Sequence, residues 1–505
     1  MRRTLIKGIA LMLALLTLLS AVACATVGEG DETTTSGETT AGGDMSSAGE
    51  TTEEVTETAE LHPLTVPEDY KVDDKVSLLY WSDVEMPEFE VEDITGHTVN
   101  DQIYWRNEYT EERLGMTFEW HSTPGNSGNR TQFAAFVEAS YEANDRAYDI
   151  VSAYSRTVGI LSIKGFLADL NAIEGSHINL EQPWWPESLV DTVTIGDAIY
   201  FISGDISTNT LYFMYGIFCN LEMQENLGLE NPMTLVLEDT WTLGKFIEMA
   251  TDVYADTEAD GQIGEGDTFG FDTSRLHLDQ FYIGSDLRVI EKHSEDVLVV
   301  SADYSSQKLY DLIDTIATFI HTKDVWMNAN NDSTAFIEKR ALFTHNRLYY
   351  ADRKLKDVNF VYTVLPTPKY DGEQDMYLTC VGNPFSLYGI MTDASDEEQV
   401  AYTAVLEVLG YYGYNLTTPA IFEVNYKSKY SESDTASLMF DYIRNGVRYD
   451  LCRIFSVDIL TANMIPLVTL TMWDDSSWAS VHSTYIRTIK KKLKEAVAIY
   501  ADLQG

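Results

Sequence analysis

The sequence predicts a mixed α/β fold whose sheets are mostly parallel. The first reason is that strand-like and helix-like segments alternate along the chain from residue 75 onward, which is typical of βαβ units. The second is that 45% of the 505 residues are hydrophobic and 12% are aromatic, enough to bury a large core. The length suggests two to four domain-sized units as a starting point.

The first elements follow from hydrophobic runs and from helical periodicity. We expect strands at 75–81, 116–120 and 148–154, with helices at 101–114 and 129–142 between them. Alternation of elements of this length favours parallel pairing of the three strands.

The same pattern recurs after residue 210. We expect a strand at 213–218, followed by helices at 221–227 and 242–253. The segment 485–503 is expected to be an amphipathic helix, because four apolar residues fall on one stripe at helical spacing. They are Ile489, Leu493, Val497 and Tyr500. From about residue 63 to the end there is neither a linker composition nor a repeated unit.

The charge balance argues against several function classes. The chain has 34 basic and 80 acidic side chains, which gives a net charge of −46 at pH 7. Nucleic-acid binding requires Lys and Arg to displace counterions from phosphates, so this composition argues against it. It also argues against anionic membrane surfaces. We interpret the acidity as a means of staying soluble in a crowded exterior.

The N-terminus has the organisation of an export signal. Arg2, Arg3 and Lys7 precede an apolar run at 9–19, and small residues lead to Cys24. The Ala-Val-Ala-Cys sequence resembles the bacterial lipobox, whose cysteine becomes the lipidated first residue, although Ala21 stands where that pattern usually has Leu. Residues 1–23 are therefore predicted to be a lipoprotein signal peptide. An ordinary secretory signal with an incidental cysteine is the alternative.

The segment 24–62 is predicted to be a disordered tether. Between residues 25 and 60 there are ten Thr, ten Asp or Glu, no Lys or Arg and no aromatic residue. Such a composition cannot bury enough apolar surface to offset the entropy of ordering. The segment would hold a folded body away from a membrane to which Cys24 is anchored.

Three cysteines remain after Cys24, and they are Cys219, Cys380 and Cys452. They are odd in number and widely spaced, which favours free buried thiols over a disulfide framework. One disulfide with a spare cysteine stays possible on spacing alone. No cysteine or histidine spacing suits zinc.

Sequence motifs that ordinarily carry catalysis are missing. The chain has no GxxxxGK[ST], HExxH or GxSxG motif. Pairs of carboxylates are plentiful in a chain with 80 acids, so any pair proposed for glycoside hydrolysis would be a weak signal. We expect no enzyme activity, and a surface glycosidase is the alternative.

Several stretches together resemble the family 1 extracellular solute-binding lipoproteins of bacterial ATP-binding cassette sugar importers, in particular the clostridial type. Their order and spacing carry the resemblance, which covers residues 75–460. They are 104–115 (YWRNEYTEERLG), Pro183-Trp184-Trp185, Gly204-Asp205-Ile206, Trp241-Thr242, 256–271, 365–370 (LPTPKY), 429–434 (KYSESD) and Arg448-Tyr449-Asp450. The chain departs from that pattern at Cys219-Asn220-Leu221 and at Lys339-Arg340.

The resemblance implies a periplasmic-binding-protein-like fold of type II, with two α/β lobes, a hinge and a ligand cleft between the lobes. The N-lobe would comprise 75–204 plus 365–415, and the C-lobe 211–364 plus 416–505. The chain would cross between the lobes near 204–210 and again near 364–368. The implied function is a monomeric, lipid-anchored binding protein on the outer face of the bacterial cytoplasmic membrane. It would capture a mono- or oligosaccharide and deliver it to a membrane permease.

Candidate ligand contacts are aromatic platforms and polar side chains at predicted strand ends, in the loop at 183–186 and at the first implied crossing. A neutral sugar presents C–H faces to aromatic rings and hydroxyl edges to groups such as carboxylates. Ligands of open α/β sheets collect beyond the carboxyl ends of the strands. The candidates are Trp81, Asp83, Tyr154, Trp184, Trp185 and Asp205. Each aromatic candidate could instead pack in the core.

The sharpest local signal is a twelve-residue acidic loop at 256–267. Acids stand at positions 1, 3, 5 and 12, glycine at position 6 and an apolar residue at position 8, which is the arrangement of an EF-hand calcium loop. The predicted ligands of a structural Ca2+ ion are Asp256, Glu258, Asp260, Asp267 and the backbone carbonyl of Gln262. Asp at position 12 is shorter than the usual Glu, so weak affinity is expected. A solvated acidic turn is the alternative.

Other functions stay open on the sequence alone. The same fold could bind peptides or another polar solute. A cleft rich in Tyr and Trp with few unpaired charges would favour sugar, whereas an Arg or Asp facing the ligand's termini would favour peptide. A sensor or adhesin lipoprotein is a further alternative.

Overall fold

The computed structural model describes residues 62–72, 74–294, 297–427 and 433–504. Residues 61–505 form one compact unit. The predicted signal peptide, Cys24 and nearly all of the predicted tether lie outside the described residues.

The first sheet has the strand order β12-β3-β1-β2. Strand β1 pairs in parallel with both β2 and β3, and β12 pairs antiparallel with β3. The strands are β1 (Lys75–Trp81), β2 (Thr117–Thr123), β3 (Ile150–Tyr154) and β12 (Ser386–Ile390). The predicted strands at 75–81, 116–120 and 148–154 are confirmed, and so is their parallel pairing.

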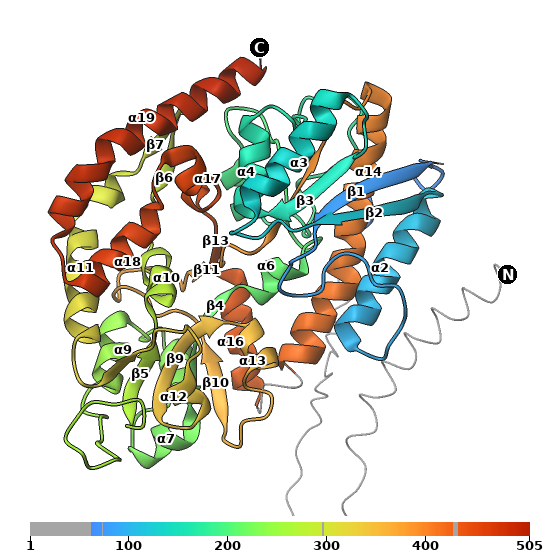
Figure 1. Ribbon diagram of the computed structural model, residues 1–505. Helices are drawn as coiled ribbons and strands as arrows, with labels where there is room; N and C mark the ends of the chain where they lie inside the picture. The colour runs from blue at the N-terminus through green and yellow to red at the C-terminus, as the bar shows by residue number, and fades with distance from the viewer. Residues whose placement is uncertain (1–61, 73, 295–296, 428–432, 505) are drawn as a thin grey trace, which may run out of the picture. The chain divides into compact units, whose positions relative to one another are not determined.

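Four helices pack around this sheet (Figure 1). They are α2 (Thr98–Leu114), α3 (Arg130–Ala143), α4 (Ser155–Ile163) and α14 (Asp396–Tyr412). Helix α2 ends where Gly115 takes a left-handed conformation with φ 68°. Helix α14 begins with a capping box in which Ser395 and Glu398 satisfy each other's backbone N–H groups.

The second sheet has the strand order β10-β4-β9-β5-β8. Its strands are β4 (Tyr215–Asn220), β5 (Phe269–Thr273), β8 (Val325–Met327), β9 (Ala341–Arg347) and β10 (Tyr362–Leu365). Strand β5 is parallel to β8 and β9, but β4 is antiparallel to both of its neighbours. The prediction of a mostly parallel sheet therefore holds for the first sheet and fails for the β4 side of the second.

Helices and short turns cover the second sheet. An aromatic cluster fills its interior, where the ring of Phe246 lies 5.0 Å from that of Phe271 and 5.3 Å from that of Phe343. The covering elements are α7 (Leu221–Asn226), α8 (Pro232–Leu237), α9 (Leu243–Ala250), η1 (Arg275–Leu278), α10 (Asp279–Gly284), η2 (Ala302–Ser305), α11 (Gln307–Ile320), α12 (Thr334–Ile337) and α13 (Tyr349–Arg353).

Two backbone segments connect the sheets side by side. The first contains α6 (Thr208–Tyr212) and begins where Ile202 forms a bridge with Tyr388 of β12. It ends where Met214 forms a bridge with Val381. The first crossing was expected near 204–210, and the structure places it between these two bridges.

The second crossing was predicted near 364–368, and this is wrong. Strand β10 pairs with β4 in the second sheet, and the Thr367 hydroxyl donates to Gln280 of α10 at 2.7 Å. The chain enters the first sheet only at Ser386. Residues 365–378 therefore lie with the second half, because the prolines at 366 and 368 directly follow the edge strand β10. Residues 383–385 already contact the start of α4, where the Ser155 hydroxyl donates to the carbonyl of Asn383 at 2.8 Å.

The C-terminal part of the chain contacts both halves. Helix α17 (Leu451–Leu460) packs on α4 beside the first sheet, where Ile454 lies against Gly159. Helix α18 (Met464–Asp474) packs on α11 beside the second sheet. The assignment of all of 416–505 to one lobe is therefore wrong, because these helices join the halves.

The last helix, α19 (Trp478–Gln504), includes the predicted segment 485–503 and starts earlier. Ile489, Leu493 and Tyr500 are buried as the stripe predicts, and Val497 is half-buried. The remaining elements are α5 (Glu187–Val193), β6 (Ile290–Ser294), β7 (Val297–Val300), β11 (Thr379–Cys380), η3 (Gly413–Thr417), η4 (Ala420–Lys427), α16 (Asp434–Asn445) and β13 (Val447–Arg448).

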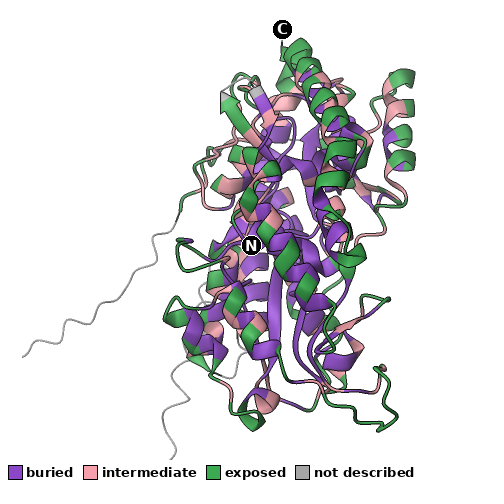
Figure 2. Cartoon of the chain, turned by 90° about the vertical axis from the view of Figure 1, so that its left-hand side faces the viewer, coloured by how far each residue is buried: buried purple, intermediate pink, exposed green. Residues whose placement is uncertain are grey.

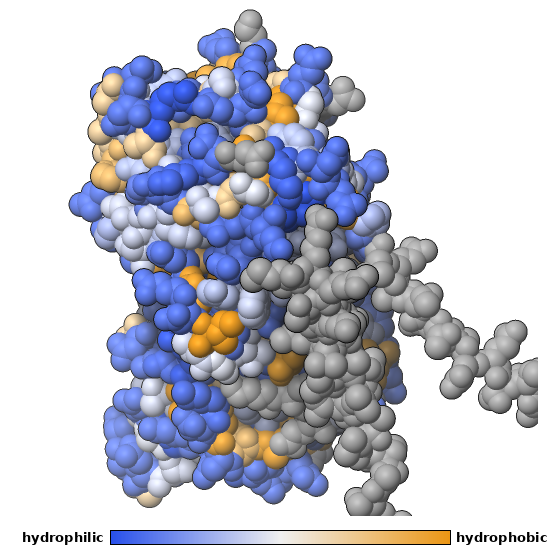
Figure 3. All heavy atoms as spheres, turned by 90° about the vertical axis from the view of Figure 1, so that its right-hand side faces the viewer, coloured by the Kyte–Doolittle hydropathy of each residue, from blue (hydrophilic) through white to orange (hydrophobic). Residues whose placement is uncertain are grey.

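Burial follows the layers. The strands and the inner faces of the helices are buried, while the outer helix faces are exposed (Figure 2). The face in Figure 3 is largely hydrophilic where it is not covered in grey, with small separate hydrophobic patches. Cys219, Cys380 and Cys452 are free and buried, which confirms that prediction.

Across the described ranges, no single helix is both long and apolar enough to cross a membrane. Helices α17 and α18 pass that test together, but they meet at an angle of 88° and most of their residues are buried.

Candidate ligand-binding site

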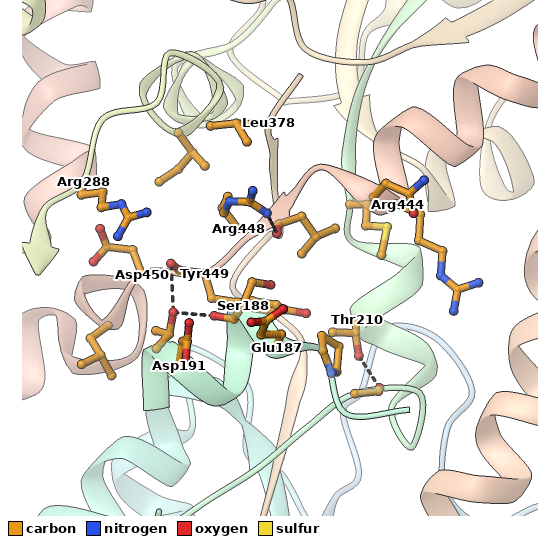
Figure 4. A pocket seen from close by; sticks show the side chains of 18 of the residues that line it. Glu187, Ser188, Asp191, Thr210, Arg288, Leu378, Arg444, Arg448, Tyr449 and Asp450 are labelled. Atoms are coloured by element: carbon orange, nitrogen blue, oxygen red, sulfur yellow. Dashed lines mark hydrogen bonds between the residues drawn. The ribbon is translucent and has the colours of Figure 1, made fainter. Parts of the chain in front are cut away.

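A cavity of about 1000 Å³ lies beside the first crossing segment, between elements of the two halves. The loop before α5 and α5 itself form one wall, and the crossing segment forms a second (Figure 4). The segment from α10 to β6 and the segment from α16 to the start of α17 form the remaining walls.

Two tryptophans fix the α5 wall from behind. The indole Nε1 of Trp185 donates to the carboxylate of Glu407 on α14 at 2.8 Å, and the ring of Trp184 meets that of Tyr411 edge-on at 5.5 Å. Burial raises the pKa of Glu407, and the Trp185 hydrogen bond opposes this. The loop is therefore anchored on α14, and α5 begins at Glu187 with its first turn facing the cavity.

Asp205 joins the crossing segment to the second half. Its backbone N–H donates to the carbonyl of Trp184 at 3.0 Å, and its Oδ1 accepts from the Thr418 hydroxyl at 3.0 Å. The Arg444 guanidinium lies 3.4 Å from both carboxylate oxygens. Burial raises the pKa of Asp205, and the charge of Arg444 opposes that shift. The carboxylate is therefore largely committed to holding the crossing.

Asp450 organises the wall opposite α5. Its Oδ1 accepts from the N–H of Cys452 at 3.0 Å and caps α17, while its Oδ2 accepts from the N–H of Val289 at 2.7 Å. Burial raises the pKa of Asp450, and these backbone hydrogen bonds oppose the rise. The adjacent Tyr449 is half-buried, and its ring meets Phe385 edge-on at 5.6 Å.

Arg448 extends from β13 above Glu187 and Ser188 of α5, with Arg288 and Arg444 on either side of it (Figure 4). Its Nη1 donates to the carbonyl of Val447 at 3.0 Å. The cavity can therefore offer a bound molecule guanidinium donors on one side and carboxylate acceptors on the other.

The lining is strongly ionic. Seven carboxylates and four cations line it, a local balance of −3. Only two aromatic side chains do so, Tyr414 and Tyr449. A stacking surface for a sugar ring is therefore small, and hydrogen bonding must supply most of the affinity for a polar ligand.

Of the six predicted ligand contacts, the structure brings only Asp205 to the cavity. Trp81 has no exposed surface; its Nε1 donates to Ser386 at 3.0 Å, and its ring lies 5.8 Å from that of the buried Tyr154. Asp83 accepts from the N–H groups of Gly125 and Asn126 at 2.7 and 2.9 Å, so it organises the turn before α3.

Trp184 and Trp185 are buried as well, with 0% and 2% exposure, and only their flanking prolines line the cavity. The four predicted aromatic contacts therefore fill the core, because their large apolar rings gain more from burial than from a place in a polar wall.

The side chains that sequence reasoning missed are mostly charged. Arg448 and Tyr449 stood in a motif that carried the family resemblance, but their position at a cavity had no sequence signal. Glu187 and Asp191 are four residues apart after Pro186, a spacing that predicts one shared helix face. Arg288 lies in a stretch without periodicity, and only the structure places it at the cavity.

A second polar cluster lies where strands β3, β5 and β9 end. Arg453 of α17 donates to Asn383 and to Asp279 of α10, both at 2.8 Å, while Arg347 at the end of β9 lies 5.1 Å from the ring centroids of Phe213 and Tyr349. Open α/β sheets collect ligands at this position. Here Asp279 and Arg347 are buried, and Arg453 of α17 forms an ion pair with Asp279 of α10 at 2.8 Å.

The acidic loop at 256–267 is turned as predicted. Gly261 at position 6 has φ 74°, and its N–H donates to Asp256 at 2.9 Å. Asp267 accepts from the N–H groups of Thr257 and Gly264, both at 3.0 Å, and these hydrogen bonds, led by that of Gly264, lower its pKa.

In this arrangement Asp256, Asp260 and Asp267 each accept from amides of the loop itself. No group of three or more His, Cys, Asp or Glu side chains in the described part of the chain is placed to hold a metal ion. Calcium binding would therefore require the acids to regroup, and it stays a prediction.

No protein-family model and no curated protein matches the chain, but solved structures do. An ABC substrate-binding protein from Listeria monocytogenes in complex with cycloalternan is 11% identical, with a TM-score of 0.52, and the match covers 83% of this chain and 99% of that one. A cyclo/maltodextrin-binding protein complexed with maltotetraose is 12% identical, with a TM-score of 0.55 and coverage of 85% and 99%.

UgpB from Mycobacterium tuberculosis in complex with glycerophosphocholine is 12% identical, with a TM-score of 0.50 and coverage of 85% and 97%. The chain has the fold of a solute-binding protein. The predicted periplasmic-binding-protein-like architecture is thereby confirmed. This solute-binding fold consists here of two α/β halves, one around each sheet, with a cavity beside the segments that join them.

Proposed function

We propose that the protein is the substrate-binding component of an ATP-binding cassette importer, and that it captures a carbohydrate in the cavity and delivers it to a membrane permease. The observation that carries this proposal is a cavity of about 1000 Å³ walled by both halves of a solute-binding fold. Two proteins of similar fold were solved with cycloalternan and with maltotetraose.

The hydrogen-bonding groups of the lining suit a hydroxyl-rich ligand. Carboxylates accept from sugar hydroxyls and guanidinium groups donate to them, and such charge-assisted bonds are stronger than neutral ones. Tyr449 supplies one apolar face. We propose that the site performs no chemistry and that ATP hydrolysis belongs to a separate subunit.

The proposal includes a place for the protein. Cys24 would carry a lipid, the tether would follow it, and the folded unit would act as a monomer on the outer face of the cytoplasmic membrane. Incorporation of labelled palmitate in a bacterial host tests the anchor. Incorporation that is lost in Cys24→Ser supports it, and equal labelling of both forms contradicts it.

A second candidate is a binding protein for peptides or another ionic solute. The balance of seven carboxylates and four cations around the cavity favours it over a neutral sugar. UgpB, with a similar fold, was solved with glycerophosphocholine, a zwitterion.

Calorimetric titration of the protein with oligosaccharides and peptides tests the proposal. We expect binding of one saccharide class, weakened about tenfold by Tyr449→Ala through loss of the apolar face. Tyr485→Ala, on the exposed part of α19, is the matched control and should leave affinity unchanged. Saccharide binding that ignores Tyr449→Ala would place the ligand elsewhere, and binding of peptides alone would establish the second candidate.

A further inference from the structure

Two carboxylates of α5 face the cavity without a partner. Glu187 and Asp191 are four residues apart on this helix and therefore share a face. Both line the cavity, and both are exposed. Within the described part of the chain, neither side chain makes a hydrogen bond or an ion pair.

The remaining carboxylates of the lining are mostly in use. Asp205 is held by Thr418 and Arg444, Asp450 caps α17, and Glu291 accepts from the Ser301 hydroxyl at 2.9 Å. Asp441 pairs with Lys427 at 2.6 Å. Asp286 also lines the cavity without a hydrogen bond or ion pair of its side chain among the described residues, but it stands alone. The α5 pair is therefore the part of the wall where two free carboxylates share one face.

Cations of the cavity do not neutralise that pair. Arg448 and Arg288 line the walls above and beside α5 (Figure 4), but no ion pair within 4.0 Å joins either of them to α5 in the described residues. Arg444 is held at Asp205. The α5 carboxylates and the guanidinium groups of Arg448 and Arg288 thus line the same cavity without forming ion pairs with each other.

This separation has an energetic consequence for the ligand. Like charges at positions i and i+4 of a helix repel each other, and a cation placed between them relieves the repulsion. An ammonium group would form charge-assisted hydrogen bonds with both carboxylates and would also be attracted to them as an opposite charge. A neutral hydroxyl would gain the hydrogen bonds alone and would leave the repulsion between the two acids in place.

We propose that the ligand carries a primary ammonium group, which Glu187 and Asp191 bind together, while Arg448 and Arg288 receive hydroxyl or anionic groups of the same molecule. This inference rests on the proposed function and specifies its substrate class. The ammonium could belong to an amino sugar within an oligosaccharide or to the terminus of a peptide.

Paired probes that differ only at the amine test the proposal. We would titrate the protein with the glucosamine disaccharide and with its N-acetylated form, and likewise with trialanine and N-acetyl-trialanine. We expect a free amine to raise affinity about tenfold or more in one of the two arms. Amine-dependent binding in the saccharide arm supports both proposals, whereas amine-dependent binding of trialanine alone keeps the ammonium assignment and overturns carbohydrate capture.

Charge-removing variants locate the contact. Glu187→Gln combined with Asp191→Asn keeps the shape of the wall, and we expect it to remove the preference for the free amine while binding of the acetylated form changes less than about twofold. Glu181→Gln, an exposed acid in the loop before α5 that does not line the cavity, is the control and should keep the preference. Unchanged thermal unfolding of each variant shows that it is folded.

The outcomes separate this inference from the proposed function. Equal or tighter binding of the acetylated probes, or of neutral maltotetraose alone, overturns the ammonium assignment and leaves carbohydrate capture standing. A preference for the amine that survives in the double variant also overturns the assignment to α5. If neither the probes nor any neutral saccharide binds, the proposed function fails and the inference fails with it.

Discussion

His345 is the most unusual side chain in the interior of the second half. It lies in β9 with no exposed surface; its ring is 4.7 Å from Phe281 and 5.9 Å from Phe271, and neither ring nitrogen has a hydrogen-bond partner among the described residues. Burial lowers its pKa well below the ordinary value, and so does the nearby His277. Burial and Arg347 lower the pKa of His277 to about 3.

These two histidines predict loss of stability in mild acid. Both bind a proton more easily in the unfolded chain, where the pKa of histidine is about 6.5. Their contribution to the free energy of unfolding is therefore fully present above that pH and is lost as the pH falls below it. Each histidine contributes a slope of about 1.4 kcal/mol per pH unit. Asp272 has the opposite effect on the pH dependence. Burial raises its pKa to about 6, so its contribution to the free energy of unfolding increases as the pH falls from about 6 to about 3.9.

The measurement is urea unfolding at pH 7 and at pH 5. We expect the free energy of unfolding to be lower at pH 5 and His345→Phe to reduce the difference, because phenylalanine fits the aromatic surroundings without a titrating group. His293→Phe, on the exposed β6 strand, is the control and should leave the slope unchanged. A pH dependence that is identical in His345→Phe and the parent would show that His345 does not titrate between the two states.

At this scale the sequence predicted residue classes better than residue roles. It identified aromatic and acidic side chains near strand ends, but Trp81, Tyr154, Trp184 and Trp185 are buried rather than placed at the cavity. Whether an aromatic ring in a loop points to the core or to the cavity depends on tertiary packing, which no local sequence pattern encodes. Asp205, at the first crossing, does line the cavity, and its contact with a ligand stays a prediction.

The tryptophan pair behind the α5 wall packs on one glycine of helix α14. A Cβ atom on Gly410 would lie 2.7 Å from Cδ1 of Trp184 and 3.1 Å from Cη2 of Trp185. We expect Gly410→Ala to displace the tryptophan pair and to lower the free energy of unfolding by about 1–3 kcal/mol. Ligand affinity should fall with it, because α5 follows directly after these rings.

Gly244→Ala is the matched control for this prediction. Gly244 is also helical, in α9, and nothing lies within 4 Å of a Cβ placed there. Removing glycine from a helix should stabilise the fold by up to about 1 kcal/mol. Thermal unfolding and calorimetric titration of both variants give the comparison. Equal stability of the two variants would contradict the tight packing at Gly410.

The acidic loop at 256–267 is predicted to bind calcium, although its hydrogen bonds hold it together without an ion. If Asp256 and Asp260 regroup around an ion, the affinity should be weak, with a Kd on the order of 10⁻⁴–10⁻³ M. Thermal unfolding in about 10 mM calcium should then show a raised midpoint. Asp256→Asn should abolish the shift, and Glu373→Gln, an exposed acid in another loop, should keep it. No shift in the parent protein returns the loop to a solvated turn.

Elements were predicted well wherever a local pattern defines them. The strand at 75–81 has the observed bounds, and the helices at 101–114 and 129–142 differ from α2 and α3 by one to three residues. Short elements such as α5 and β13 were not predicted, because seven or fewer residues carry too little periodicity. They nevertheless supply much of the cavity wall.

At the scale of the whole molecule, the fold class followed from alternating elements and from the family resemblance, and the structure confirms it. The places where the chain crosses between the halves were not all predicted from the sequence. Strand β10 lies where a crossing was expected, yet it pairs with β4 in the second sheet. Helices α17 and α18, which precede the last helix, join the halves. Such long-range pairing depends on the geometry of the whole sheet, which a local pattern does not contain.

The central claim is that the cavity captures a carbohydrate and releases it unchanged. The most direct test is thermal unfolding of the protein with mono- and oligosaccharides, amino acids and peptides, followed by chromatography of the recovered ligand. A ligand that binds only the folded state must raise the unfolding midpoint. We expect one saccharide class to raise the midpoint and to be recovered intact. Failure of every saccharide to raise it, or recovery of hydrolysed sugar, would overturn capture without chemistry.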